Sequence, residues 1–81
     1  MYYTYVLQSE QDYTYYIGYC SDLEKRLEDH NRGKTKSIKH KLPLKLIYYE
    51  GYPNKRHAIM RENQLKKNRR EKEKILERLN W

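Results

Sequence analysis

The sequence contains no phenylalanine, a single cysteine and no long hydrophobic run. One cysteine cannot form an internal disulfide, which excludes a disulfide-stabilised scaffold, and we interpret Cys20 as a small packing residue. A transmembrane helix needs about 18 consecutive apolar residues, and no segment of the chain approaches that length. The N-terminus also lacks a signal-peptide pattern. We therefore expect a soluble, cytoplasmic protein.

Glycine and histidine are too few and too scattered for two common kinds of site. The glycines stand alone in the sequence and form no phosphate-binding loop: Gly18, Gly33 and Gly51. The histidines have no Cys or His partner at zinc-ligand spacing, which argues against a structural zinc site: His30, His40 and His57. The residues left for chemistry are tyrosine, arginine, histidine and glutamate.

Tyrosine takes the place of phenylalanine, and basic residues outnumber acidic ones. The 81 residues suffice for one small domain, and 10 of them are tyrosines, so we expect tyrosine rings to supply much of the core. Lys and Arg number 18 against 11 Asp and Glu, which gives a formal charge of +7. A small domain with this charge has a strong positive potential, so its natural partner is a polyanion.

Two segments rich in tyrosine and β-branched residues predict strands near the N-terminus. They span residues 2–8 and 13–20, and the short polar stretch between them is typical of a β-hairpin. Because such a loop does not fix the register, the sequence leaves open whether Tyr5 and Tyr16 face the same side of the sheet. A third strand is expected at residues 44–49.

Capping residues and periodicity predict three helices. The first is expected at residues 22–32, capped by Ser21 or Asp22 and ended by Gly33. The second is expected at residues 54–68, and the asparagine at its end can cap a third. The element order is therefore ββαβαα.

Arg26 and His30 lie four residues apart on the predicted first helix, on the side of its two leucines. At about 100° per residue, Leu23 and Leu27 mark the buried stripe, and Arg26 and His30 lie at its rim. One interpretation is structural, with a packed arginine stem beside a half-buried histidine. The other is a phosphate clamp, because the guanidinium fork matches phosphate oxygens and a histidine one turn along can exchange a proton.

The predicted second helix carries its only acid on its apolar stripe. Ala58 and Leu65 mark that stripe, and Glu62 falls between them. The carboxylate has two interpretations that the residues alone do not separate. It can form a structural ion pair with Lys66, one turn further on. Alternatively, its hard oxygens can bind Mg²⁺ or Mn²⁺.

Four features follow one another along the chain: Tyr3-Thr4-Tyr5, Tyr16-Ile17-Gly18, Asp22-Leu23-x-x-Arg26-Leu27-x-x-His30, and Glu62. Together they resemble the GIY-YIG nuclease superfamily, specifically its small stand-alone bacterial members, although the opening Gly-Ile-Tyr motif keeps only its tyrosine. The resemblance implies an α+β fold in which a small three-stranded antiparallel sheet is flanked by helices. Gly18 is then expected to let the backbone approach closely where a side chain would interfere.

The resemblance implies catalytic roles for Tyr5, Tyr16, Arg26 and His30, and a metal-binding role for Glu62. The implied reaction is hydrolysis of a phosphodiester bond in DNA, assisted by one Mg²⁺ or Mn²⁺ ion, with RNA not excluded. In this scheme Arg26 stabilises charge on the phosphorane and Tyr5 helps to deprotonate the attacking water. Tyr16 and His30 orient that water or pass protons.

Residues 32–41 are basic, contain no acid and lack periodicity, so we expect an exposed loop that contacts phosphates. Two lysines near the end of the second helix are expected to assist. The candidate nucleic-acid-binding residues are Lys34, Lys36, Lys39, Lys41, Lys66 and Lys67. Because such contacts do not read bases, we expect an enzyme directed to single strands or DNA structure, or targeted by a partner protein.

Two other classes of function stay open. In the first, the protein is a binding module without catalysis, whose tyrosines stack on bases while basic residues follow the nucleic-acid backbone. In the second, it is a protein-interaction domain that uses the apolar C-terminal end at Leu76, Leu79 and Trp81. The presence of all five motif residues favours the enzyme.

Overall fold

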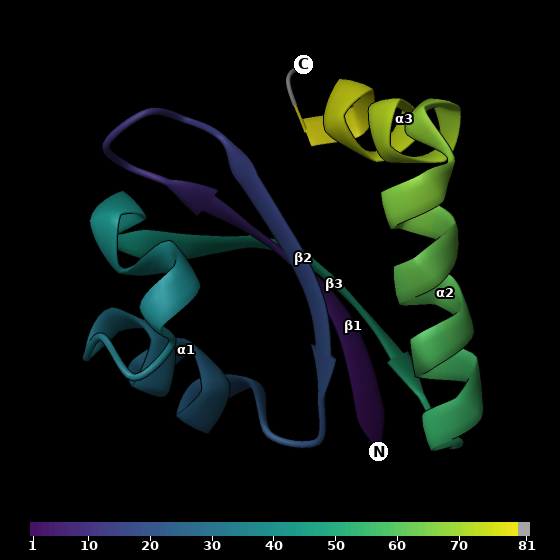
Figure 1. Cartoon of the computed structure of the whole chain (residues 1–81). Helices are drawn as coiled ribbons and strands as arrows, with labels where there is room; N and C mark the ends of the chain where they lie inside the picture. Colours follow the sequence, from purple (N-terminus) through teal and green to yellow (C-terminus); the bar gives the residue numbers. More distant parts are fainter. Residues whose placement is uncertain (80–81) are drawn as a thin grey trace.

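The computed structural model describes residues 1–79, apart from the side chains of Lys36 and Ser37, so Trp81 lies outside the described residues. The elements are β1 (Tyr2–Ser9), β2 (Tyr15–Cys20), α1 (Leu23–Asn31), the 3-10 helix η1 (Lys36–Lys41), β3 (Leu44–Tyr52), α2 (Lys55–Lys67) and α3 (Arg69–Leu79) (Figure 1). The predicted α+β class and the order ββαβαα are confirmed, and η1 is an element that the sequence did not predict.

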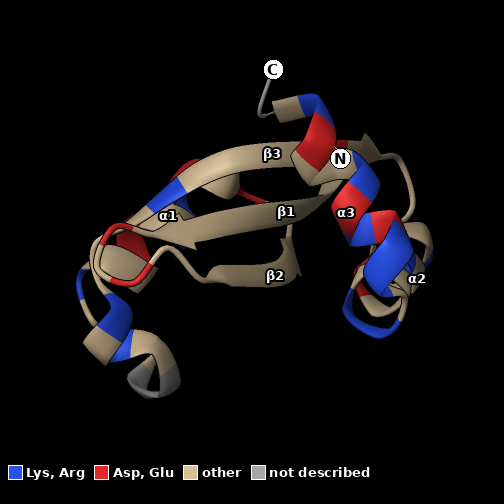
Figure 2. Ribbon diagram, turned by 90° about the horizontal axis from the view of Figure 1, so that it is seen from above, with Lys and Arg blue, Asp and Glu red and all other residues tan. Residues whose placement is uncertain are grey.

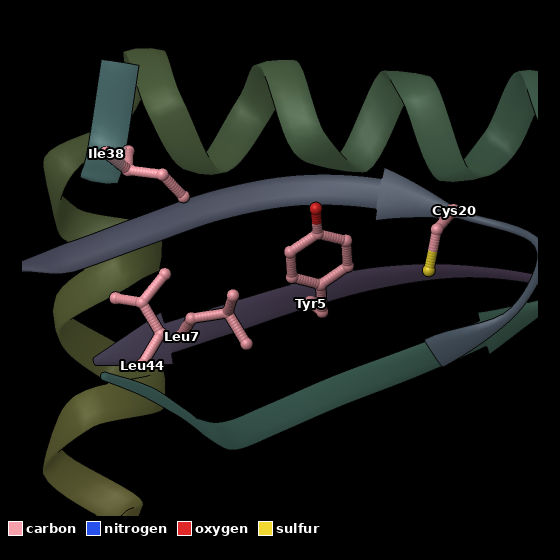
Figure 3. Close-up of a cluster of buried hydrophobic side chains, with 5 residues drawn as sticks. All are labelled: Tyr5, Leu7, Cys20, Ile38 and Leu44. Carbon is pink, nitrogen blue, oxygen red and sulfur yellow. The ribbon is translucent and has the colours of Figure 1, made fainter. Parts of the chain in front are cut away.

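The three strands within residues 1–79 form one antiparallel sheet in the order β2-β1-β3. Helix α1 and η1 lie on one side of the sheet, and α2 and α3 lie on the other (Figure 1). The alternating side chains of β1 therefore serve two cores. One core holds Tyr5, Leu7, Cys20, Ile38 and Leu44 (Figure 3). The other holds Val6, Ile17, Leu65 and Ile75.

Residues 32–41 keep much of the exposure that the sequence predicted, but they are not only a loop. Lys36–Lys41 forms η1, and Ile38 is only 5% exposed because its side chain enters the core beside Leu7 and Leu44. A single apolar residue among basic ones gives no periodic signal, so the packing of this segment could not be read from sequence. The segment thus covers one end of α1 and of the sheet.

Two strand boundaries also differ from the prediction. Strand β2 begins at Tyr15 because Tyr13 adopts a left-handed turn conformation with φ of 61°. Strand β3 continues to Tyr52, beyond the predicted end, even though Glu50 lies within it. The Glu50 carboxylate accepts hydrogen bonds from the hydroxyls of Tyr48 (2.6 Å) and Tyr52 (2.5 Å), so the strand can hold this charge.

The ends of α1 are fixed by local hydrogen bonds. The Asp22 side chain, rather than Ser21, caps the helix by accepting from the Lys25 amide at 3.1 Å. At the other end Gly33 has φ of 79°, and its amide donates to the His30 carbonyl. This glycine-ended turn stops the helix immediately after His30 and leads the chain back across that side chain.

Polar contacts tie helix α2 to the central strand β1 and to the edge strand β3. The Thr4 hydroxyl donates to the Ala58 carbonyl at 2.7 Å, which joins α2 to β1. Arg61 donates from Nε to Glu50 at 2.8 Å and from Nη2 at 3.1 Å, which joins α2 to β3. Burial alone would raise the pKa of Glu50, but the bonds from Arg61 and the two tyrosine hydroxyls outweigh it and lower that pKa. Glu50 is thus held as a carboxylate.

Within residues 1–79, no helix has the length and apolar character needed to cross a membrane.

Candidate active site

The Tyr5 ring occupies the space that Gly18 leaves free. The register pairs Tyr5 of β1 with Gly18 of β2. In Figure 3 the ring stands up from β1 with its hydroxyl beside β2. A Cβ atom on Gly18 would lie 2.5 Å from the Tyr5 hydroxyl oxygen and 2.7 Å from Cζ, too close for any side chain. Gly18 therefore allows a close approach, as expected, but the group that approaches is Tyr5.

Tyr5, His30 and Thr35 form a buried chain of hydrogen bonds. The Tyr5 hydroxyl lies 3.2 Å from His30 Nε2, and the Thr35 hydroxyl lies 2.8 Å from His30 Nδ1. His30 is 1% exposed, so the predicted position at the rim of the core was wrong. The reason is the chain reversal at Gly33, which lays Thr35 over the imidazole. The contact of Thr35 with His30 could not be predicted from the sequence, because residues beyond a glycine turn follow no helical periodicity.

The surroundings of this chain keep both rings neutral. Burial lowers the pKa of His30, and the charge of Arg26 lowers it further, while Asp29 opposes them. Burial also raises the pKa of Tyr5 well above its ordinary value, with the Tyr16 phenol adding to the effect and Arg26 opposing it. A neutral imidazole therefore faces a protonated phenol.

Tyr16 lies on the same side of the sheet as Tyr5, which answers the question that the sequence left open. It pairs with Leu7, two positions along β2 from Gly18, so both tyrosines face α1. The Tyr16 ring meets His30 edge-on, with ring centroids 5.2 Å apart and planes inclined by 72°. Tyr16 is half-buried, whereas Tyr5 is 2% exposed. Solvent therefore reaches Tyr16 before it reaches Tyr5.

Arg26 stands exposed at the mouth of this cluster. It lines two surface hollows that also share Cys20 and Ser21. It forms no ion pair with any of the described side chains, and its charge lowers the pKa of both Tyr5 and His30. The guanidinium is thus available to an anion.

Glu62 approaches the same place from the other side of the sheet. It lies on α2, which packs against the edge strand β2, and its side chain is 14% exposed. Its negative charge contributes to the raised pKa of Tyr5, so the carboxylate and the phenol lie within electrostatic reach of each other. The ion pair with Lys66 is also present at 3.6 Å, with Lys66 half exposed. A pair of this kind contributes about 0.3–0.5 kcal/mol and yields readily to a stronger cation.

The donor set fits a magnesium-like ion held by one protein ligand. No cluster of three or more His, Cys, Asp or Glu side chains suited to a metal occurs in the part of the chain that the structure describes. Mg²⁺ commonly takes one or two carboxylates and completes its shell with waters and substrate phosphate. Glu62 meets that requirement.

The predicted DNA-binding lysines do not form one surface. Figure 2 shows Lys and Arg on η1 and, on the far side of the sheet, on α2 and α3. Lys34 pairs with Asp29 at 3.2 Å, and Lys41 donates to the Thr14 hydroxyl at 2.7 Å. Lys39 packs over Gly33, Lys66 pairs with Glu62, and Lys67 is exposed. The side chain of Lys36 lies outside the described atoms.

Known proteins resemble this chain over nearly its whole length. The family model described as the GIY-YIG catalytic domain matches residues 1–75. A UPF0213 protein of Streptococcus pneumoniae serotype 4 is 45% identical over 91% of this chain and 76% of its own length. A UPF0213 protein of Lactococcus lactis subsp. cremoris is 44% identical over 95% of this chain and 91% of its own.

A solved structure extends the likeness to the fold. The solution NMR structure of a UPF0213 protein from Bacillus halodurans has a TM-score of 0.59 and 31% identity, covering 95% of this chain and 84% of that one. The relatives' names specify no substrate. The match over nearly all of the described residues, together with the tyrosine, arginine, histidine and glutamate of the site, establishes that the chain belongs to the GIY-YIG nuclease family.

Proposed function

We propose that this protein is a divalent-metal-dependent endonuclease that hydrolyses phosphodiester bonds in DNA, with a preference for single strands or DNA structure over sequence. The observation that carries the proposal is the convergence at the edge of β2. Arg26, which has no ion pair among the described residues, and the Glu62 carboxylate both act on the pKa of Tyr5. Tyr5 in turn contacts His30, and these residues come from three different elements. Membership of a nuclease family supports the same reaction class.

Glu62 would hold the cation, Mg²⁺ or Mn²⁺, at the end of the site nearest α2. When bound, such an ion polarises the phosphate and offsets its developing charge. The protein's own contribution is to keep the Glu62 side chain only 14% exposed and to hold it at a fixed rotation of α2. The neighbouring Arg61 fixes that rotation through its bonds to Glu50.

Tyr16, Tyr5 and His30 would manage the proton of the attacking water. We assign Tyr16 to orient the water, because it is the more accessible phenol. Tyr5 would accept a proton from the water while its own proton passes to the neutral Nε2 of His30, so that no free phenolate is needed. The raised pKa of Tyr5 argues against a phenolate as the base in the protein without substrate or metal. The relay is compatible with that pKa, because Tyr5 gives up its proton only as it accepts another.

Arg26 would bind the phosphate and stabilise the charge that builds on it during attack. The hydroxide forms a bond to phosphorus, the bond to one bridging oxygen breaks, and solvent protonates the departing oxygen. Because Arg26 has no carboxylate partner among the described residues, no ion pair has to break before it binds the phosphate. Its accessible position at the hollow mouth suits contact with a polymer strand.

Cleavage of end-labelled single-stranded, blunt duplex and branched DNA in Mg²⁺ or Mn²⁺, with EDTA as the control, tests the proposal. We expect metal-dependent cutting that EDTA abolishes, with the single-stranded or branched DNA cut faster than the duplex. Salt-sensitive binding without cutting on any substrate would contradict the enzyme and support the stacking module instead.

A further inference from the structure

The groove beside Arg26 has other lining residues, to which the proposed reaction assigns no role. It lies where the end of β2 meets the first turn of α2, and its lining consists of Tyr2, Tyr19, Cys20, Ser21, Arg26 and Lys55. Figure 1 shows the N-terminal end of β1 beside the start of α2, which is where this groove opens. Its volume is about 300 Å³, at the lower end of the roughly 300–1,000 Å³ typical of small-ligand sites.

The sheet register places both tyrosines of the groove on one face. Tyr19 pairs with Thr4, whose side chain bonds to α2, so Tyr19 faces α2 as well. Tyr2 lies two residues before Thr4 and has the same orientation, which makes the two rings diagonal neighbours. Both tyrosines are half-buried, so part of each side chain stays accessible to a ligand.

The cations of the groove are free of acidic partners. Neither Arg26 nor Lys55 forms an ion pair among residues 1–79, in contrast to Lys34, Lys41 and Lys66. No Asp or Glu lines the groove itself. Two open aromatic rings with two unpaired cations are the combination that binds single-stranded nucleic acid, in which bases stack on rings and phosphates meet the charges.

The groove lies on the side of α2 that also carries the proposed metal ligand. Lys55 and Glu62 are seven residues apart on α2, so they lie on the same side of the helix and about 10 Å apart along its axis. Arg26 belongs both to the groove and to the Tyr5–His30 cluster. A strand in the groove would therefore lie next to the proposed site of cleavage.

We propose that this groove binds an unpaired nucleotide next to the scissile phosphate, with its base on Tyr19 and Tyr2 and its phosphate on Lys55 and Arg26. The inference rests on the proposed nuclease function and adds the substrate feature that the groove selects. A base can lie on a tyrosine ring only when it is not stacked in a duplex, so fully paired DNA cannot fill the groove.

The test is equilibrium binding of fluorescein-labelled oligonucleotides in EDTA, where no cleavage occurs. The probes are a single strand, the same sequence as a blunt duplex, and that duplex with one unpaired nucleotide. The variants are Tyr19→Leu and the solvent-exposed Lys55→Gln. The matched controls are Tyr15→Leu, on the same strand and face, and Lys45→Gln, both from the hollow at the other end of the sheet.

We expect Tyr19→Leu to weaken binding of both unpaired probes by about tenfold or more while changing blunt-duplex binding little. Lys55→Gln should reduce the slope of log affinity against log salt by about one. Both controls should match the wild type, and circular dichroism confirms that each variant is folded. If Tyr19→Leu weakens binding of all three probes equally, or weakens it no more than Tyr15→Leu does, the proposed role of the groove is wrong.

Parallel cleavage by the wild type separates the two proposals. If the wild type cleaves DNA but binding does not depend on Tyr19 or Lys55, the proposed groove is wrong and the nuclease function stands. Binding that depends on both residues, with no cleavage in either metal, removes the nuclease and leaves the groove as a nucleotide-binding site.

Discussion

Replacing Arg61 with methionine should destabilise the protein and thereby release α2. Arg61 joins three elements, because it bonds to Glu50 of β3 at 2.8 and 3.1 Å and to Glu71 of α3 at 3.4 Å. It also precedes Glu62 in the sequence. Methionine keeps the apolar stem and removes only the charge and its donors.

The magnitude follows from burial. The side chains of Arg61 and Glu50 are only 19% and 18% exposed, so their pair lies between the surface and interior cases. Surface pairs contribute up to about 1 kcal/mol, and breaking a buried pair costs about 3–5 kcal/mol. We therefore expect a loss of about 2–3 kcal/mol, from a total of about 4–12 kcal/mol for a domain of this size. The corresponding fall in Tm is roughly 10–20 °C.

The loss should also depend on pH. In the wild type the folded-state pKa of Glu50 is lowered overall, because the bonds from Arg61 and the tyrosine hydroxyls outweigh burial. Its contribution is therefore present above the unfolded pKa of about 4.3 and disappears as the pH falls through the folded pKa. Without Arg61 the pKa of Glu50 rises, so the stability difference between wild type and variant should shrink towards low pH.

Urea denaturation followed by circular dichroism at about pH 7 and about pH 4 measures both effects. The control is Arg56→Met, an exposed arginine on the same helix that has no ion pair with a described residue. Arg61→Met should be the less stable variant by the stated margin at the higher pH. A difference from Arg56→Met below about 0.5 kcal/mol, or one that does not narrow at the lower pH, would show that the Arg61–Glu50 pair does not stabilise the fold in this way.

Two further changes follow from the buried cluster. Burial lowers the pKa of His30 in the folded state, so the wild type should lose stability as the pH falls below about 6.5. The Tm of His30→Gln should therefore depend less steeply on pH. Equal slopes of Tm against pH for the two proteins, between about pH 7 and pH 5.5, would contradict this. Gly18→Ala should destabilise by about 1–3 kcal/mol in urea denaturation, because its methyl group meets the Tyr5 ring, and Tyr5→Leu in the same chain should recover part of the loss; strictly additive losses would show that the ring is not the obstacle.

The secondary structure, and the placement of several candidate site residues on it, could be predicted from local patterns. Tyrosine and β-branched runs identified the strands, and the spacing of Arg26 and His30 placed both on one helix near Leu27. Glu62 was recognisable as the acid on an apolar stripe, and the structure shows it only 14% exposed. Each of these inferences depends on contacts within about one or two helical turns, which sequence periodicity records.

Other features depend on contacts between distant segments, which periodicity does not record. The burial of Tyr5 needs the register that sets it opposite Gly18, and a hairpin loop of uncertain geometry does not fix that register. The burial of His30 needs Thr35, which the turn at Gly33 brings back over the ring. The free charge of Lys55 can be recognised only once the partners of other lysines are known.

The central claim is that Glu62 holds the catalytic cation. The most direct measurement compares the cleavage rate of Glu62→Gln with that of Glu77→Gln, an exposed acid on α3, at saturating Mn²⁺ on single-stranded DNA. The amide keeps the shape of the side chain but removes the charge that attracts the metal. We expect the rate of Glu62→Gln to fall by at least about a hundredfold with its Tm retained, while Glu77→Gln cuts like the wild type. Wild-type cleavage by a folded Glu62→Gln variant would contradict the account.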